Sequence, residues 1–210
     1  METKVLNITK WLGAGSINLF GRPFAGKDTQ GQILAETVGG ALVGGGDILR
    51  SHHDPAAIEQ IMAAGGIIPS EYYLNMILPY LSRPEFSGKP LILSAVGRAH
   101  GEENAVLQAA EASGHPLMAV IVLNLPETEV WRRFEQAQQS HDRGSRSDDS
   151  REVLQNRLQK FNDKTLPVID FYREKGLLIE VDGTGTKEAV SQGIFDSLMR
   201  VAAAAAQGPK

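Results

Sequence analysis

The chain has no cysteine, so disulfide bridges and thiolate chemistry are excluded. It also lacks long hydrophobic runs, because no segment approaches the roughly 20 apolar residues that a helix needs to cross a bilayer. Near the N-terminus, Asn7, Thr9 and Lys10 interrupt the apolar residues, which leaves no core for a signal peptide. We therefore expect a soluble, cytoplasmic protein that makes no contact with a membrane.

The charge balance shows no excess of basic residues. A net charge of −4 gives no reason to expect nucleic acid as a partner, because proteins that bind it are usually basic overall or on one face. Small anions remain possible ligands. With 210 residues, 42% of them apolar, the chain is long enough for one sizeable core, and we expect a single domain.

Apolar runs of strand length alternate with helical patterns along the chain. Five runs predict strands, at 16–21, 41–44, 90–95, 117–123 and 177–181, and the later ones are apolar on both faces. Capping residues and apolar spacing predict helices at 55–64, 71–82, 101–114, 127–139, 149–164, 167–175 and 187–205. Strands buried on both faces are typical of a parallel sheet between two helical layers, so we predict a three-layer α/β fold. Residues 1–13 precede this pattern as an extension.

A glycine-rich loop joins the first predicted strand to the first helix after it. Gly21, Gly26 and Lys27 fit the pattern G-x-x-x-x-G-K, in which backbone N–H groups surround phosphate oxygens and the lysine reaches the terminal phosphates. The alternative is a glycine-rich turn with a solvated lysine. Asp28 occupies the position after the lysine, where Ser or Thr usually faces magnesium.

Residues 21–30, GRPFAGKDTQ, resemble the adenylate kinase loop G-x-P-G-x-G-K-G-T-Q. Further patterns of that family recur in the same order, at 46–50 (G-D-x-L-R), 61–69 (the helix and turn around the monophosphate), 94–98 (D-G-F-P-R), Arg133 (the lid hinge), 146–149 (R-x-D-D), Arg157 and 181–183 (near the ATP base). The resemblance covers about residues 16–200, and its short polar segment after residue 136 is similar to the short-lid branch of the family.

The resemblance implies a P-loop NTPase fold with a five-stranded parallel sheet, a helical insert that binds the nucleoside monophosphate, and a short lid. In a single domain over residues 1–210, the core takes in 16–47, 84–135 and 148–205, the monophosphate-binding segment 48–83 and the lid 136–147. The implied function is a nucleoside monophosphate kinase that uses Mg²⁺ with ATP, and AMP is the favoured acceptor. We expect nucleotides as its only partners, a monomer, and no zinc site.

The resemblance also assigns roles to residues. The catalytic group would be Lys27, Arg98, Arg133, Arg146 and Arg157. ATP would be bound by Gly21, Phe24, Ala25, Gly26, Lys27, Asp28, Thr29, Arg133 and Gly183. The monophosphate would be bound by Gly46, Arg50, Ile67, Ile68, Arg98 and Glu102. Arginine suits this chemistry because the negatively charged phosphates of donor and acceptor must be neutralised and aligned for direct transfer.

Three departures from the family bear on activity and specificity. Ser94 replaces the aspartate of D-G-F-P-R, and we hypothesise that Asp28 supplies the missing carboxylate through Mg²⁺; otherwise Asp28 only caps or pairs locally. Phe24 replaces a loop glycine. Glu102 replaces the glutamine that reads adenine, and an ionised carboxylate cannot donate to adenine N1. A kinase for GMP, CMP or a deoxynucleotide, or a nucleotide-binding protein without turnover, therefore remains open.

Overall fold

A computed structural model of the chain describes residues 2–51, 70–140 and 150–207. Its centre is a five-stranded sheet in the order β2-β3-β1-β4-β5, and all neighbouring strands pair in parallel. The strands span β1 (Ser16–Gly21), β2 (Ala41–Gly44), β3 (Leu91–Ser94), β4 (Leu117–Asn124) and β5 (Leu178–Asp182). All five lie where the sequence predicted them, and the predicted α/β fold with a parallel sheet is confirmed.

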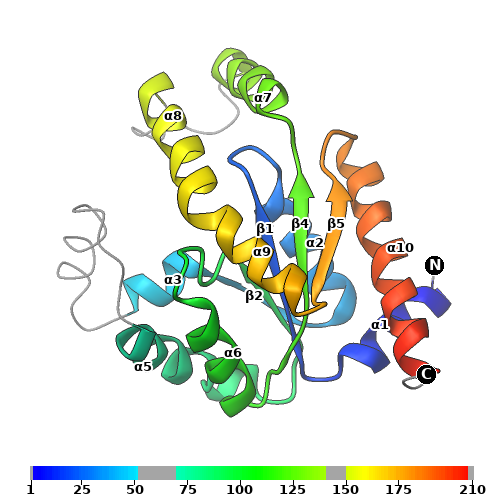
Figure 1. Cartoon of the computed structure of the whole chain (residues 1–210). Coiled ribbons are helices and arrows are strands. Elements are labelled where there is room, and N and C mark those ends of the chain that lie inside the picture. The colour runs from blue at the N-terminus through cyan, green and yellow to red at the C-terminus, as the bar shows by residue number, and fades with distance from the viewer. Residues whose placement is uncertain (1, 52–69, 141–149, 208–210) are drawn as a thin grey trace.

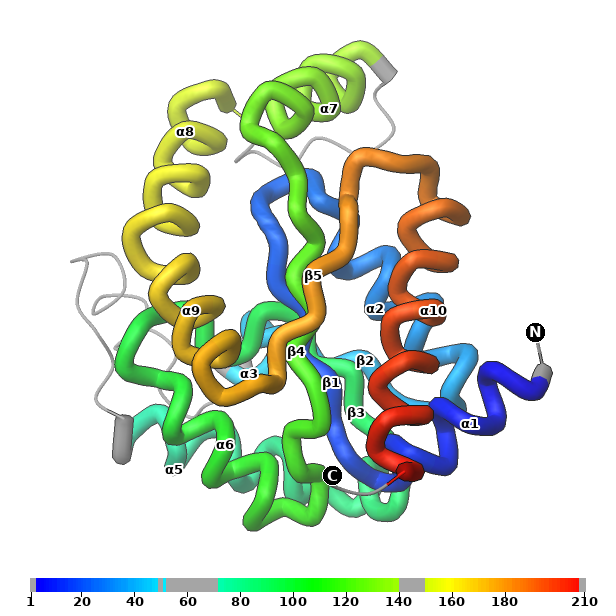
Figure 2. Tube along the Cα trace, turned by 45° about the vertical axis from the view of Figure 1, so that its right-hand side comes forward, coloured from blue at the N-terminus to red at the C-terminus, as the bar shows by residue number. Residues whose placement is uncertain are grey.

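Helices cover both faces of the sheet (Figures 1 and 2). One face carries α1 (Glu2–Leu12), α2 (Lys27–Val38) and α10 (Lys187–Ala206), and the other carries α5 (Ser70–Leu81), α6 (Glu103–Ala112) and α9 (Leu166–Glu174). Within the described ranges, the other α-helices are α3 (Gly45–Arg50), α7 (Glu127–Ser140) and α8 (Arg151–Lys160), which lie toward the carboxyl ends of the strands. A short 3₁₀ turn, η1 (Pro84–Phe86), precedes β3. No helix in the described part of the chain is both long and apolar enough to span a bilayer.

Side chains alternate between the two faces along each strand. In β1, Ile17 and Leu19 pack into the core beneath α1, α2 and α10, whereas Phe20 packs with Val168 and Tyr172 on the opposite face. This alternation follows from the two-residue period of a strand. It divides the interior into separate apolar clusters, one of which lies between β2, β3, α5 and α6.

The N-terminal extension forms the helix α1, which packs against α10 and α2. Ile8 and Leu12 are buried in the main core, and Lys4 pairs with Asp196 of α10 at 2.8 Å. Leu6 faces solvent, so only part of the apolar pattern in the extension is buried. α1 therefore belongs to the same folded unit as the sheet.

The helix after residue 150 continues through a single π turn. The turn η2 (Phe161–Thr165) joins α8 to α9 where the sequence predicted two separate helices. Pro167 follows at the start of α9, and because proline has no N–H, the regular hydrogen-bond ladder cannot continue through it. A π turn shifts the ladder by one residue and lets the chain remain helical past that point.

Two buried tyrosines allow a test of how much a buried hydroxyl contributes to stability. The Tyr73 hydroxyl accepts a hydrogen bond from Gly97 N at 2.8 Å, whereas the Tyr172 hydroxyl has no hydrogen-bond partner within the described ranges. Tyr73→Phe should lower the free energy of unfolding by about 1–3 kcal/mol, because it leaves a buried N–H unpaired. Tyr172→Phe should leave the stability unchanged or raise it. Denaturant titration of both variants measures the contrast, and equal losses would contradict it.

Candidate active site

The loop between β1 and α2 has the geometry of an anion-binding turn. Gly26 precedes α2 with a left-handed backbone, φ 82°, and Lys27 is the first residue of the helix. A Cβ on Gly21 would lie 3.0 Å from the Cβ of Ala25, which is closer than side chains normally approach. The start of a helix carries N–H groups without intrahelical partners and a positive potential, so the turn suits phosphate oxygens. Thr29 is exposed in the first turn of α2.

Asp28 and Ser94 meet at the carboxyl end of β3. The Ser94 hydroxyl donates a hydrogen bond to Asp28 Oδ1 at 2.5 Å, and Lys27 Nζ lies 3.4 Å from Asp28 Oδ2. A carboxylate from the loop thus lies against the strand position where the resembled family has its aspartate. The Asp28 side chain stays largely exposed, so it can also reach a ligand at the loop.

Phe24 occupies a backbone conformation that favours glycine. Its φ is +63°, which costs a non-glycine residue roughly 1–2 kcal/mol. The ring packs edge to face against Phe134 of α7, with ring centroids 5.8 Å apart, and lies partly buried against the main core. The backbone keeps the left-handed conformation that glycine would adopt there.

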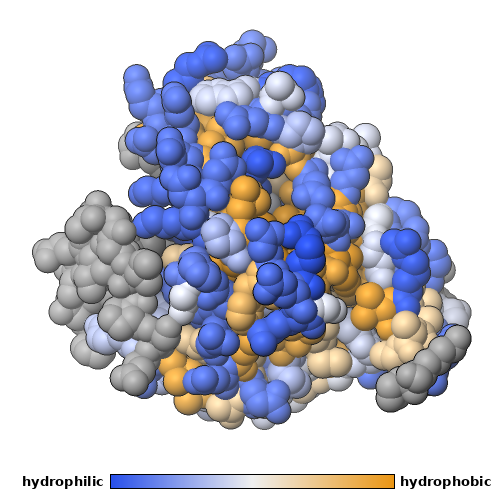
Figure 3. Space-filling view, in the orientation of Figure 1, coloured by the Kyte–Doolittle hydropathy of each residue, from blue (hydrophilic) through white to orange (hydrophobic). Residues whose placement is uncertain are grey.

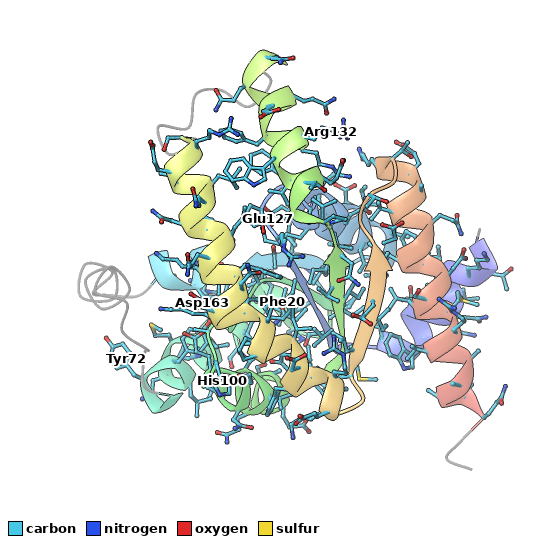
Figure 4. The ribbon with its side chains drawn as sticks, turned by 45° about the horizontal axis from the view of Figure 1, so that its top comes forward. Phe20, Tyr72, His100, Glu127, Arg132 and Asp163 are labelled. Carbon is cyan, nitrogen blue, oxygen red and sulfur yellow. The ribbon has the colours of Figure 1, made fainter. Side chains whose placement is uncertain are left out.

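Arg133 joins two other predicted parts of the ATP site, the phosphate loop and Gly183. Its guanidinium donates to the carbonyl of Phe24 at 3.1 Å, to the carbonyl of Gly183 at 2.7 Å and to Glu129 at 3.0 Å. Glu129 also accepts from Arg132, and hydrogen bonds from Arg132 and Arg133 lower the Glu129 pKa to about 2. Arg132 lies on the side of α7 that faces away from α8 (Figure 4).

Three buried polar groups fix the turn that carries Arg98. The side-chain amide of Asn18 donates to the carbonyl of Val96 at 2.7 Å and accepts from Val96 N at 3.3 Å. Thr165 of the π turn donates to the carbonyl of Arg98 at 3.0 Å, and Tyr73 binds Gly97 N as described above. The Arg98 side chain is exposed. These groups were not predicted from the sequence, although one signal was available: Asn18 is a polar residue in the middle of a buried strand.

Two of the residues at which this turn differs from the family pattern have a left-handed backbone. Ala95 has φ +52° at the position of the family's glycine, so it keeps the conformation that glycine favours. Gly97 has φ +68° at the position of the family's proline, which cannot reach that angle and has no N–H to donate to Tyr73. A Cβ on Gly97 would also lie 2.3 Å from Val106. The turn therefore requires glycine at position 97.

Glu102 is a buried carboxylate, with only 6% of its surface exposed. Its Oε2 accepts a hydrogen bond from Ala99 N at 3.1 Å. Burial raises the Glu102 pKa from 4.5 to about 7; the Ala99 N–H, Arg98 and Lys164 lower it, and Glu103 raises it. Glu103 itself is buried and accepts from Gly101 N at 2.7 Å, with His100 Nδ1 at the same distance. His100 lies beside the helix formed by α8 and α9 (Figure 4).

Of the other predicted site residues, some lie in described helices and the rest fall outside the described ranges. Gly46 lies in α3 and Arg157 lies half-buried in the last turn of α8. Arg146, Ile67 and Ile68, the side chain of Arg50, and the predicted lid from residue 141 on fall outside the described residues. Residues 136–140, also assigned to the lid, belong to α7. Among the described residues, no group of three or more acidic or histidine side chains could hold a metal ion.

Comparison with known proteins relates the chain to one family. A family model described as adenylate kinase matches residues 19–177. The chain is 34% identical over 185 residues to the adenylate kinase of Xylella fastidiosa strain M23, covering 86% of this chain and 97% of that protein. It is 32% identical over 185 residues to that of Stenotrophomonas maltophilia strain R551-3, with the same coverage. For Thermus thermophilus the identity is 31% over 181 residues, covering 83% and 92%.

Glu102→Gln should change how stability depends on pH. Because the Glu102 pKa is about 7 in the folded protein and 4.5 ordinarily, the unfolded chain loses this proton first as pH rises. Stability held by the native side chain is therefore lost between about pH 4.5 and 7, by roughly 2–4 kcal/mol, and the glutamine variant should not lose it. Denaturant titrations over this range measure the difference. Glu111→Gln, at an exposed position of α6, is the control, and parallel curves for all three proteins would contradict the assignment.

Proposed function

The chain belongs to the adenylate kinase family, and from that premise we propose that it transfers the γ-phosphoryl group of Mg-ATP to a nucleoside monophosphate, with AMP as the favoured acceptor. The observation that carries the proposal is the phosphate loop. Lys27 begins α2 behind a left-handed Gly26, and Arg133 hydrogen-bonds both that loop and Gly183. The reaction, ATP + AMP = 2 ADP, needs only small nucleotides as partners, and we expect the protein to act as a monomer.

Lys27 and the loop amides form the proposed phosphate half of the ATP site. The amides from Phe24 to Thr29, including those of Ala25 and Gly26, would surround the β-phosphate, and Lys27 would reach the β- and γ-phosphates. Gly21 supports this half by allowing close packing against Ala25. Since the Lys27 side chain is only 27% exposed, its charge acts in a partly desolvated setting, where electrostatic interactions are stronger than in water.

Arg133 suits the base of ATP better than its phosphates. Its N–H groups already donate to Phe24, Gly183 and Glu129, so few are left for phosphate oxygens. A guanidinium held in this way still presents a flat face, and arginine stacks well on aromatic rings. We therefore assign Arg133 to the ATP base, with Gly183 beside it.

The other arginines would neutralise charge during transfer. Arg98 is exposed at the end of a turn fixed by three buried groups, which limits the entropy lost when it binds a phosphate. Arg157 of α8, with Arg50 and Arg146, completes the set that family membership suggests. No general base is needed, since alignment and charge stabilisation account for phosphoryl transfer. Gly46, Ile67 and Ile68 would line the acceptor.

Asp28 and Ser94 fit a site for the magnesium of Mg-ATP. Mg²⁺ usually takes one or two carboxylates together with phosphate oxygens and waters, and Asp28 supplies a carboxylate beside the phosphate loop. When bound there, the ion would supply positive charge that offsets the negative charge of the ATP phosphates. P-loop NTPases such as GTPases and ATPases place a hydroxyl on the loop and an aspartate on a neighbouring strand. Here the carboxylate is on the loop and the hydroxyl on the strand, so the same two groups are present in exchanged positions.

Glu102 can read adenine when it is protonated. A neutral carboxyl group has one hydroxyl to donate to adenine N1 and one carbonyl to accept from the N6 amino group, as a glutamine amide does. The raised pKa of Glu102, about 7, keeps this neutral form available near neutral pH. The ionised form suits guanine or cytosine donors instead, so a kinase for GMP or CMP is the second candidate.

A coupled assay over AMP, GMP, CMP and their deoxy forms tests the function. AMP should be the best acceptor, and its KM should rise above about pH 7 in the native protein but not in Glu102→Gln, because only the native residue ionises there. Lys27→Ala should lower kcat by about a hundredfold or more. Substantial turnover without Lys27 would remove the loop assignment. Tight binding of a dinucleotide polyphosphate without turnover would instead indicate a nucleotide-binding protein that has lost catalysis.

The proposed roles of Asp28 and Ser94 predict how activity depends on the Mg²⁺ concentration. Asp28→Gly should need a roughly tenfold higher Mg²⁺ concentration for half-maximal rate, because it removes the carboxylate that the phosphate loop would offer to the ion. Ser94→Ala removes the hydrogen bond to Asp28 and should have a smaller effect. The double variant Asp28→Ser with Ser94→Asp restores the usual arrangement and should recover much of the native response. An unchanged magnesium titration for Asp28→Gly would refute the role of Asp28.

A further inference from the structure

Phe24 is tied to α7 by both its side chain and its backbone. Its ring packs edge to face on Phe134, and its carbonyl accepts the hydrogen bond from Arg133. Phe134 and Arg133 are neighbours on α7, so the two contacts hold one short segment of this helix against the phosphate loop. Glycine at position 24 would keep the left-handed backbone without strain but would lose the contact with Phe134.

The contact continues from α7 toward α8. Phe134 packs edge to face on Trp131 at 6.0 Å, and the guanidinium of Arg151 lies 5.1 Å from the centre of the Trp131 ring. We call Phe24, Phe134 and Trp131 the aromatic bridge. Phe134 is buried in the main core, and Phe24 and Trp131 pack against it while partly buried. Hydrophobic surface is visible between α7, α8 and the upper end of the sheet, framed by hydrophilic side chains (Figure 3).

The aromatic bridge adjoins Arg133, because Phe134 is the next residue of α7. Arg133 is carried by α7, and its two backbone acceptors, on Phe24 and Gly183, belong to separate loops at the end of the sheet. If α7 shifts relative to the phosphate loop, Arg133 cannot keep its hydrogen bonds to Phe24 and Gly183 at the same time. A rigid aromatic ring between loop and helix limits this shift, because cores pack at close to crystal density and resist small displacements.

We propose that Phe24 is a positioning residue for the donor nucleotide: through Phe134 it clamps α7 onto the phosphate loop and so holds the Arg133 guanidinium in place over the ATP base. This inference rests on the proposed function, because it assigns the base of ATP to Arg133. It accounts for a bulky side chain at a position where glycine would avoid the strain of a left-handed backbone. Phe24 acts on the nucleotide through Arg133 and makes no contact with the base itself.

Steady-state kinetics separate this role from a general loss of stability. Phe24→Gly should raise the KM for ATP roughly tenfold, and Phe24→Leu by less, while kcat and the KM for AMP change by less than about twofold. Phe134→Leu should act in the same way. The double variant Phe24→Gly with Phe134→Leu should be no worse than the poorer single variant, since both remove one contact. Phe171→Leu, which disrupts the edge-to-face pair with Tyr172, is the matched control and should leave the KM for ATP unchanged.

Trp131 provides a spectroscopic readout that does not depend on turnover. The chain has two tryptophans, so Trp11→Phe leaves Trp131 as the only indole. In that background, a non-hydrolysable ATP analogue should change the Trp131 emission, and adding Phe24→Gly should alter the unliganded emission and weaken analogue binding roughly tenfold.

The outcomes distinguish the inference from the function on which it rests. Failure of the native protein to bind the analogue would overturn both. If the native protein binds and turns over ATP, but Phe24→Gly binds the analogue as tightly as the native protein, the inference alone is overturned. The inference is also overturned, and the function kept, if the effects of the two phenylalanine substitutions on the KM for ATP simply multiply, because the two rings would then act independently.

Discussion

Parallel pairing of β1 with β3 and β4 is the constraint on which the site depends. It brings the carboxyl ends of three strands to one edge of the sheet, and the phosphate loop, the turn that carries Arg98, and α7 each leave from that edge. Residues distant in sequence therefore meet without any long loop to carry them. The hydrogen bonds from Asn18 to Val96 and from Arg133 to Gly183 then fix the relative positions of these segments.

The phosphate loop could be predicted from sequence because its determinants are local. A buried strand, two glycines at positions 21 and 26, a lysine and the start of a helix follow one another within a short stretch, and each limits the backbone of the next. The strands were also predictable, since their continuous apolar character indicates burial on two faces. By contrast, Tyr73 and Thr165 act on residues 24 and 67 positions away, and no sequence period reports such a contact. The π turn before Pro167 escaped prediction for a related reason: proline indicated a break, whereas the helix continued with a shifted ladder.

The departures from the family pattern are compensated by their surroundings. Phe24 and Ala95 stand where the family has glycine, and both keep a left-handed backbone, so the course of the chain is preserved at some cost in strain. Gly97 replaces a proline, and its N–H gains the Tyr73 hydroxyl as a partner. Asp28 and Ser94 are joined by a hydrogen bond that was not predicted; the sequence suggested only that Asp28 replaces the missing carboxylate. Each departure taken alone suggests a weakened site, but their neighbours restore the missing conformation or group.

The sheet separates the packing of the two proposed nucleotide sites. The aromatic bridge belongs to the core beneath α2 and α10, while Tyr73 and the helix that follows Glu102 belong to the cluster between α5, α6 and β3. Side chains in different clusters share few neighbours, and substitutions at such distant positions tend to have additive effects. The preference for one acceptor base can consequently change during evolution while ATP binding is kept. A fold divided in this way can give rise to enzymes that use the same phosphoryl donor but accept monophosphates with different bases.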